Sequence, residues 1–368
     1  MSKIKNQILL LYVISVLESF KLAGASWVAL LASRGFSMLE IGAAESIFHI
    51  ASLLFEVPSG VISDVFGRKR SMMLCHGMFV LSACTMMLSE SFPGVAAAMV
   101  MNALAYNFAS GSREALAYDS LKEVGQEEKY ALFSSWELMI YRIGNAAATL
   151  LIGLALALGW QRAYGLDVGM AAVCLFLSWH LREPFCSGGE NQASGRNEER
   201  MSDRIVFCFR ESFAFIMKNP KAMKLMGWNA LVGASATLTL YFLQAKLPEA
   251  GMNLKLLGPA LFLMSLGGAA GAKAAPFLSG WTYRRVSLLC FAGVVLGFMA
   301  SLAGIPGLMI AGGFLGAFFD DLIQVRTDIR LNGMVPSGQR ATLLSISSLC
   351  FSGVMIVLSV FFGGVYGM

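Results

Sequence analysis

The chain has 368 residues, of which 57% are hydrophobic and 14% charged, with a formal net charge of +5. Soluble domains are about 45–50% apolar and about 25% charged, so a soluble fold could not bury this much apolar surface. The positive charge lies on connections between apolar runs, so we expect no nucleic-acid partner.

Apolar runs recur along the whole chain, each about 20 residues long and so able to cross a ~30 Å hydrocarbon core as a helix. The first run lacks a small-residue cleavage site, which favours a membrane helix over a removed signal peptide. The fold class predicted is an all-α membrane protein with eleven transmembrane helices. They are expected at residues 8–31, 39–63, 70–90, 94–119, 131–158, 161–181, 222–246, 254–279, 285–304, 306–328 and 341–364.

The central segment 182–203 is the one long polar stretch, rich in Gly, Ser, Asn and Glu, and it is typical of a linker. Residues 204–220 mix apolar and charged side chains and are too short to span, so we expect an amphipathic helix on the membrane surface. The predicted domains are a six-helix bundle at 1–181, a cytoplasmic linker at 182–221 and a five-helix bundle at 222–368.

The cations fall mainly on alternate connections, which share one side of the membrane. This bias predicts a cytoplasmic N-terminus, because loops rich in Lys and Arg stay inside. The cations on that side are Lys3, Lys5, Arg68–Arg70, Lys122, Lys129, those within 182–224, Arg284, Arg285, Arg326, Arg330 and Arg340, whereas the opposite side carries Arg34, Arg162, Lys246 and Lys255.

Motifs of metal and enzyme sites are missing. The seven cysteines are scattered without a C-x-x-C pair, which predicts reduced thiols, no disulfide framework and no metal site. The chain has no H-E-x-x-H, no G-x-S-x-G and no P-loop, so we expect neither an enzyme nor an ATP-driven pump, and no cofactor.

The connector Gly60-Val-Ile-Ser-Asp64-Val-Phe-Gly67-Arg68-Lys69-Arg70 lies between the second and third runs. Gly60 is expected where two helices approach closely, and Gly67 where a very short link needs a positive φ. Asp64 lies four residues before Arg68 and could pair with it. The segment resembles the G-x-L-x-D-x-x-G-R-[RK] signature of the major facilitator superfamily, with Ile62 in place of Leu.

Three further segments resemble a bacterial branch of that superfamily whose members mostly have no assigned substrate. They are Ser110–Leu121, Asn332–Ser345 and Glu56–Gly60. The resemblance implies two related bundles of six helices with a cavity between them. Only five spans follow the linker, so we expect the twelfth helix to be missing. The connector Ser279–Arg285, at the place of the signature's repeat, keeps its cations and lacks the Asp.

The resemblance also implies a cytoplasmic gate that closes in the outward-open state. Asp64, Arg68 and Asp119 would join helices two, three and four, and Asp64 would face the start of helix eleven near Arg340. The predicted gating residues are Gly60, Asp64, Gly67, Arg68, Arg70, Arg113, Glu114, Asp119 and Arg340.

Charged side chains inside the spans are costly and need a partner or a wet cavity. Glu18 and Lys21 are three residues apart, which could make a static salt bridge on one helical face or a functional pair. His49 is either a packed core residue or a proton carrier. The candidates for binding substrate or proton are Glu18, Lys21, Arg142, Lys273, Asp320 and Asp321, with Glu18 first and Asp320 second for proton coupling.

The function predicted is secondary active transport of a small molecule by alternating access, coupled to a proton or another ion, in the bacterial cytoplasmic membrane. Export of an amphipathic compound is the first interpretation, and uptake of a polar nutrient by symport is the alternative. A transport-inactive membrane sensor or assembly subunit is a second class, favoured by the missing twelfth helix. We expect a monomer, which is the default for the fold, surrounded by the lipid bilayer.

Overall fold

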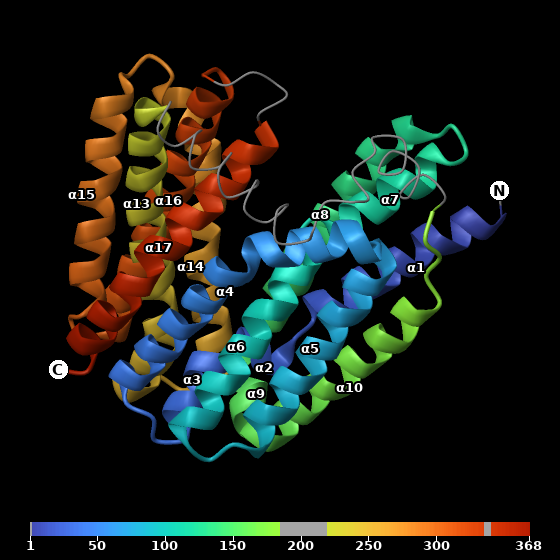
Figure 1. Cartoon of the computed structure of the whole chain (residues 1–368). Helices are drawn as coiled ribbons and strands as arrows, with labels where there is room; N and C mark the ends of the chain where they lie inside the picture. The colour runs from blue at the N-terminus through green and yellow to red at the C-terminus, as the bar shows by residue number, and fades with distance from the viewer. Residues whose placement is uncertain (1, 185–218, 335–339) are drawn as a thin grey trace. The chain divides into compact units, whose positions relative to one another are not determined.

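The computed structural model describes residues 2–184, 219–334 and 340–368, and within them every regular element is a helix (Figure 1). The first part contains α1 (Ser2–Ser19), α2 (Leu22–Ala25), α3 (Trp27–Ser33), α4 (Met38–Phe66), α5 (Arg68–Leu88), α6 (Phe92–Ala109), α7 (Ser112–Lys122), η1 (Glu127–Lys129), α8 (Tyr130–Leu150), α9 (Ile152–Leu158) and α10 (Trp160–Trp179). The second contains α13 (Pro220–Glu249), α14 (Leu254–Ala274), η3 (Ala275–Leu278), α15 (Tyr283–Ser301), α16 (Pro306–Asn332) and α17 (Arg340–Tyr366). The all-α class is confirmed.

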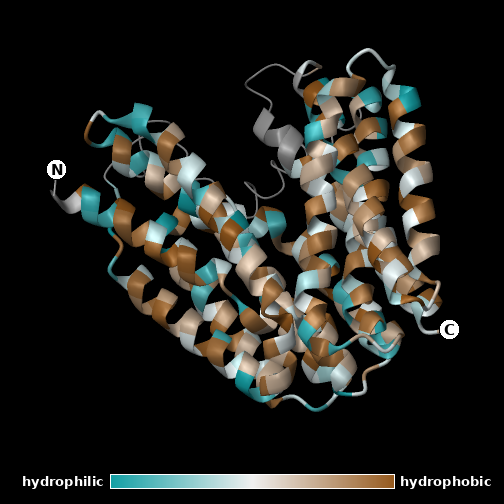
Figure 2. Cartoon of the chain, turned by 180° about the vertical axis from the view of Figure 1, so that it is seen from behind, coloured by the Kyte–Doolittle hydropathy of each residue, from teal (hydrophilic) through white to brown (hydrophobic). Residues whose placement is uncertain are grey.

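Hydrophobic residues cover much of these helices (Figure 2). Among the described residues, 8 helices are long and apolar enough to cross a membrane, or 9 if α8 and α9, which meet at 52°, form one span. The expected count of eleven is therefore not confirmed. The segment predicted as the sixth span corresponds to α10, which carries Arg162 and Asp167 and is not among the eight.

The first predicted span is not one continuous helix. It breaks after Ser19 and again at Ser26, giving α1, α2 and α3. Asp167 of α10 stabilises the first break, because its carboxylate accepts hydrogen bonds from the backbone N–H groups of Leu22 (2.8 Å) and Gly24 (2.9 Å). The first amides of a helix generally lack an acceptor within the helix, and lipid offers none, so a carboxylate at this position is favourable.

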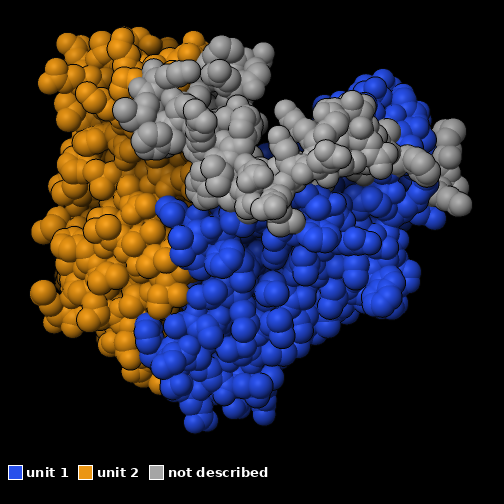
Figure 3. Space-filling view, viewed as in Figure 1, with its two compact units in different colours: residues 1–25, 51–148, 158–210 blue, residues 26–50, 149–157, 211–368 orange. Residues whose placement is uncertain are grey.

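The chain forms two compact units (Figure 3). Unit 1 comprises residues 1–25, 51–148 and 158–210, and unit 2 comprises residues 26–50, 149–157 and 211–368. The predicted boundaries at 181 and 222 stay a prediction, and most of the predicted linker and its amphipathic helix lie outside the described residues.

Unit 1 has a core of apolar side chains from α1, α5, α7, α8 and α10. It includes Leu11, Ile14, Met72, Leu116 and Cys174, each at most 1% exposed. Because these residues come from distant parts of the sequence, the core fixes the helices that carry the polar site described below.

Unit 2 is held together by close helix contacts at glycines. A Cβ at Gly267 or Gly271 of α14 would strike the backbone of α16, so only glycine permits this approach. The beginning of α4 packs on α17 in the same manner through Gly42 and Gly363.

His49 lies in the contact between α4 and α17. It is 7% exposed, and its Nδ1 is 3.2 Å from the Ser352 hydroxyl, while its Nε2 is 3.4 Å from the Glu45 carboxylate. This agrees with the packed, hydrogen-bonded alternative.

Candidate functional site

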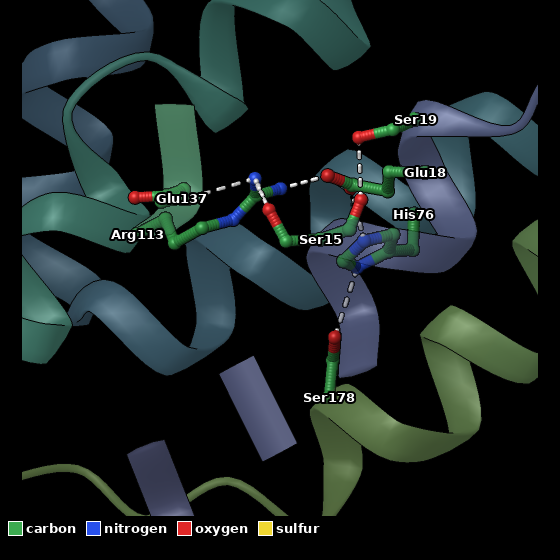
Figure 4. Close-up of polar contacts among 7 residues, drawn as sticks. All are labelled: Ser15, Glu18, Ser19, His76, Arg113, Glu137 and Ser178. Atoms are coloured by element: carbon green, nitrogen blue, oxygen red, sulfur yellow. Dashed lines mark hydrogen bonds and ion pairs between the residues drawn. The ribbon is translucent and has the colours of Figure 1, made fainter. Parts of the chain in front are cut away.

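A buried network of charged side chains lies inside unit 1 (Figure 4). Glu18 comes from the last turn of α1, His76 from α5, Arg113 from the first turn of α7 and Glu137 from α8. Their side chains are 13%, 0%, 15% and 12% exposed, respectively. Four helices thus each supply one ionisable group to a site that is largely shielded from solvent.

Glu18 is the centre of the network. One carboxylate oxygen lies 2.5 Å from His76 Nε2, and the other forms an ion pair with the Arg113 guanidinium. The opposite ring nitrogen of His76, Nδ1, lies 2.9 Å from the Ser178 hydroxyl of α10. Arg113 also donates to Glu137 at 3.1 Å. Glu18 therefore bonds two basic groups, and Arg113 bonds two acids.

The network is electrically neutral only when it binds one additional proton. Glu18 and Glu137 bring two negative charges when ionised, and Arg113 brings one permanent positive charge. A proton on His76 or on Glu18 makes the group neutral, which a buried site favours because isolated charge is costly there. The arrangement can hold or release one proton at the Glu18–His76 contact.

Lys21 does not pair with Glu18 as a static salt bridge. Because α1 ends at Ser19, the spacing of three residues no longer places both side chains on one helical face. Instead, Lys21 Nζ lies 3.0 Å from the centroid of the Phe79 ring and 5.5 Å from that of Tyr106. This is a cation–π site next to the carboxylate network.

Unit 2 holds the two predicted aspartates, which face different helices. A Cβ at Gly233 of α13 would lie 3.1 Å from Asp320 Oδ1, and a Cβ at Gly268 of α14 would meet the Asp321 carboxylate. Each acid of α16 therefore occupies space that a glycine leaves on the adjacent helix.

The other two predicted binding residues are exposed. Arg142 lies on the exposed side of α8, and Lys273 lies near the end of α14. Among the described contacts, neither joins the Glu18 network or the two aspartates.

The signature connector is as tight as expected. Only Gly67 separates α4 from α5, and its φ is +95°, which confirms the predicted positive φ. The carboxylate of Glu183, which follows α10, accepts hydrogen bonds from the backbone N–H groups of Arg68 and Lys69, both at 2.8 Å. Arg68 also donates to Ser63 at 3.1 Å.

The close helix contact expected at Gly60 stays a prediction. Gly60 is exposed on α4, and no described atom of another segment lies within 4 Å of a Cβ built there. Arg70 and Glu114 are exposed, and Asp119 is half-buried. The side chains of Asp64 and Arg340 lie outside the described residues, so the gate cluster stays a prediction.

Sequence reasoning missed the residues that complete these sites. These residues form hydrogen bonds with partners far away in the chain; for example, Asp167 bonds Leu22, which is 145 residues away. They are His76, Ser178, Asp167 and Glu183. One signal was available: His76 and Asp167 are polar residues inside predicted spans, where each such residue needs a partner.

One group of residues in the described part of the chain has the donor types and spacing of a metal site. The ligand atoms of Glu18, Cys75 and His76 lie within 4.8 Å of one another. However, Arg113 already pairs with Glu18, so a cation there would have to displace a guanidinium. The donor set does not fit a resident metal well.

Comparisons with known proteins agree on one family. Residues 8–288 match the model of the Major Facilitator Superfamily. An uncharacterised MFS-type transporter, YxaM of Bacillus subtilis (strain 168), is 25% identical over 359 residues, covering 93% of this chain and 83% of that protein.

Solved structures share the fold. The crystal structure of the nucleoside transporter NupG matches with a TM-score of 0.76 and 17% identity, covering 98% of this chain and 91% of that one. A D-xylose-proton symporter matches with a TM-score of 0.65 and 13% identity, covering 98% and 90%.

Proposed function

Because the chain belongs to the major facilitator superfamily, and so is a multi-pass membrane transporter, we propose that it takes up a small polar solute together with a proton. Solute and proton would cross by alternating access, and Glu18 would bind the proton. The protein would lie in the bacterial cytoplasmic membrane with its N-terminus inside, as the distribution of cations favours.

The Glu18 network is the observation that carries the proposal. When Glu18 is ionised, it pairs with Arg113 and contacts His76. A proton on Glu18 removes that ion pair and leaves the guanidinium bonded to the Glu137 carboxylate at 3.1 Å and to the Ser15 hydroxyl at 3.3 Å. Arg113 could then donate to a solute. Proton binding and solute binding would thus share one arginine, which is a direct means of coupling them.

The polar character of the site favours a polar solute over an amphipathic compound. The charged network and the nearby Lys21 offer hydrogen bonds and not an apolar surface. Two proteins with the same fold are named as a nucleoside transporter and a D-xylose-proton symporter, and both solutes are rich in hydroxyl groups. We therefore propose a nucleoside-like or sugar-like solute.

The test uses the purified protein in proteoliposomes with an imposed proton gradient, acidic outside. Nucleosides and pentoses are offered in turn, and both solute accumulation and internal pH are recorded. We expect the active solute to enter with protons. Glu18→Gln should abolish accumulation driven by the gradient and leave exchange of solute across the membrane intact, because exchange needs no net proton movement.

Glu249→Gln is the matched control, since Glu249 is an exposed acid that pairs with Lys246 at the end of α13. This variant should behave as the unmodified protein. Full gradient-driven accumulation by Glu18→Gln would refute the role of Glu18. Movement of solute against the proton flux would show export instead, and binding without any transport would favour the sensor class.

A further inference from the structure

A basic pocket lies in unit 2, and none of its lining residues belongs to the proposed transport site. It is an open hollow of about 800 Å³ formed by the start of α13, the connector between η3 and α15, and the last turns of α16. Five of its lining residues are cations, namely Lys221, Lys224, Arg284, Arg326 and Arg330.

The charged residues that line this pocket are all positive. Among the described residues, no Asp or Glu lines it. The nearest acid in the sequence is Asp328 of α16, whose carboxylate accepts both its described hydrogen bonds from Gln324. Five positive groups converging on one hollow repel one another, and an anion placed among them relieves that repulsion.

The wall of the pocket holds two arginines in place. Arg326 donates one Nη2 hydrogen bond to the backbone carbonyl of Trp281 at 3.0 Å. The Arg330 guanidinium lies 5.2 Å from the centroid of the Tyr283 ring, and the hydroxyl of Tyr283 is 2.9 Å from that of Thr327. Since a guanidinium has five N–H donors in a planar fork, arginines fixed in this way are suited to a phosphate group.

Apolar side chains rim the same pocket. Trp281, Ile329 and Met334 all line it and are 48%, 65% and 40% exposed. The pocket lies where α13 and α15 begin and α16 ends, which is the depth at which a spanning helix reaches the lipid headgroups. A ligand with a phosphate and an attached acyl chain matches both parts of this surface.

We propose that this pocket binds the phosphate of an anionic phospholipid headgroup, with the rim side chains against its acyl chain. Basic pockets between helix ends on the cytoplasmic side suit such headgroups. The proposal explains why the connector Ser279–Arg285 keeps the cations of the signature although it lacks the Asp: here the cations serve a lipid and not a gate.

The test measures lipid retention by the full chain. The protein is purified from nanodiscs of phosphatidylcholine that contain a minor fraction of phosphatidylglycerol or cardiolipin, and bound lipids are counted by native mass spectrometry. The unmodified protein should retain the anionic lipid selectively. Lys224→Gln combined with Arg284→Gln should weaken retention by roughly five-fold for each cation removed.

The control is the pair Arg162→Gln and Lys255→Gln, which removes the same charge at exposed cations outside the pocket. This pair should retain lipid normally. Lys224→Arg with Arg284→Lys keeps the charge and should also bind, which guards against misfolding of the glutamine variant. Equal retention by the glutamine variant and its control would overturn the proposal.

A second arm separates lipid from free phosphate. Inorganic phosphate is titrated against the protein, and its thermal unfolding in detergent is followed. We expect no stabilisation by inorganic phosphate at concentrations where the anionic lipid stabilises. Stabilisation by inorganic phosphate that the Lys224→Gln and Arg284→Gln variant loses, without selective lipid retention, would overturn the assignment to lipid.

Discussion

At the scale of single residues, Arg113 decides how much charge the interior of unit 1 can hold. Its guanidinium pairs with both Glu18 and Glu137, and all three side chains are at most 15% exposed. In such a site the attraction between the paired charges compensates for the free energy lost when each is removed from water. A buried charge without its partner keeps that desolvation cost and gains no attraction.

Replacing Arg113 therefore has an effect that depends on Glu18. Arg113→Gln leaves two buried carboxylates without their shared cation and should lower the free energy of unfolding by about 3–5 kcal/mol. Adding Glu18→Gln removes one of the two negative charges and should restore part of that loss. Thermal unfolding in detergent measures the stability of Arg113→Gln, Glu18→Gln and the double variant. Losses that simply add would contradict coupling between the two residues.

At the scale of elements, helix α5 begins under unfavourable electrostatic conditions. Arg68, Lys69 and Arg70 place three cations at its N-terminus, where the helix dipole is already positive. Glu183 offsets this by accepting hydrogen bonds from two of the first amides. Gly67 is part of the same arrangement, because a Cβ there would lie 2.9 Å from the Glu183 carboxyl carbon.

The two glycines of the signature should respond oppositely to alanine. Gly67→Ala puts a side chain at φ +95° and against Glu183, which should cost about 1–3 kcal/mol of stability. Gly60→Ala meets open space inside a helix and should be neutral or stabilising by up to about 1 kcal/mol. Denaturation of both variants in detergent checks this, and an equal loss in both would disprove the account of Gly67.

At the scale of the whole molecule, much of the fold could be predicted from sequence because apolar length alone identifies most spans. Helices α4, α5, α13 and α17 lie close to where hydropathy places them. The break in the first span could not be predicted, because its stabilising group, Asp167, lies far away in the chain. For the same reason the partners of Glu18 were missed: periodicity assumes an unbroken helix and suggested Lys21.

The predicted cytoplasmic gate also concerns the whole molecule, because it would control exchange between two states of the transporter. We expect Asp64→Asn to reduce turnover in proteoliposomes more than it reduces thermal stability, since the carboxylate would stabilise one state and not the fold. Asp328→Asn, at the exposed end of α16, is the control for loss of a carboxylate. Normal turnover by Asp64→Asn would contradict a gating role.

The Asp167 bonds to Leu22 and Gly24 also bear on biogenesis. During synthesis the α1–α2 segment leaves the ribosome well before α10 exists, so the amides of Leu22 and Gly24 lack the Asp167 carboxylate until that later helix arrives. A backbone amide left unsatisfied in hydrocarbon costs several kcal/mol, so the loss of this acceptor is unfavourable there. A nascent chain truncated before residue 167 would therefore hold an incompletely inserted first segment, a defect that membrane proteases and chaperones can recognise.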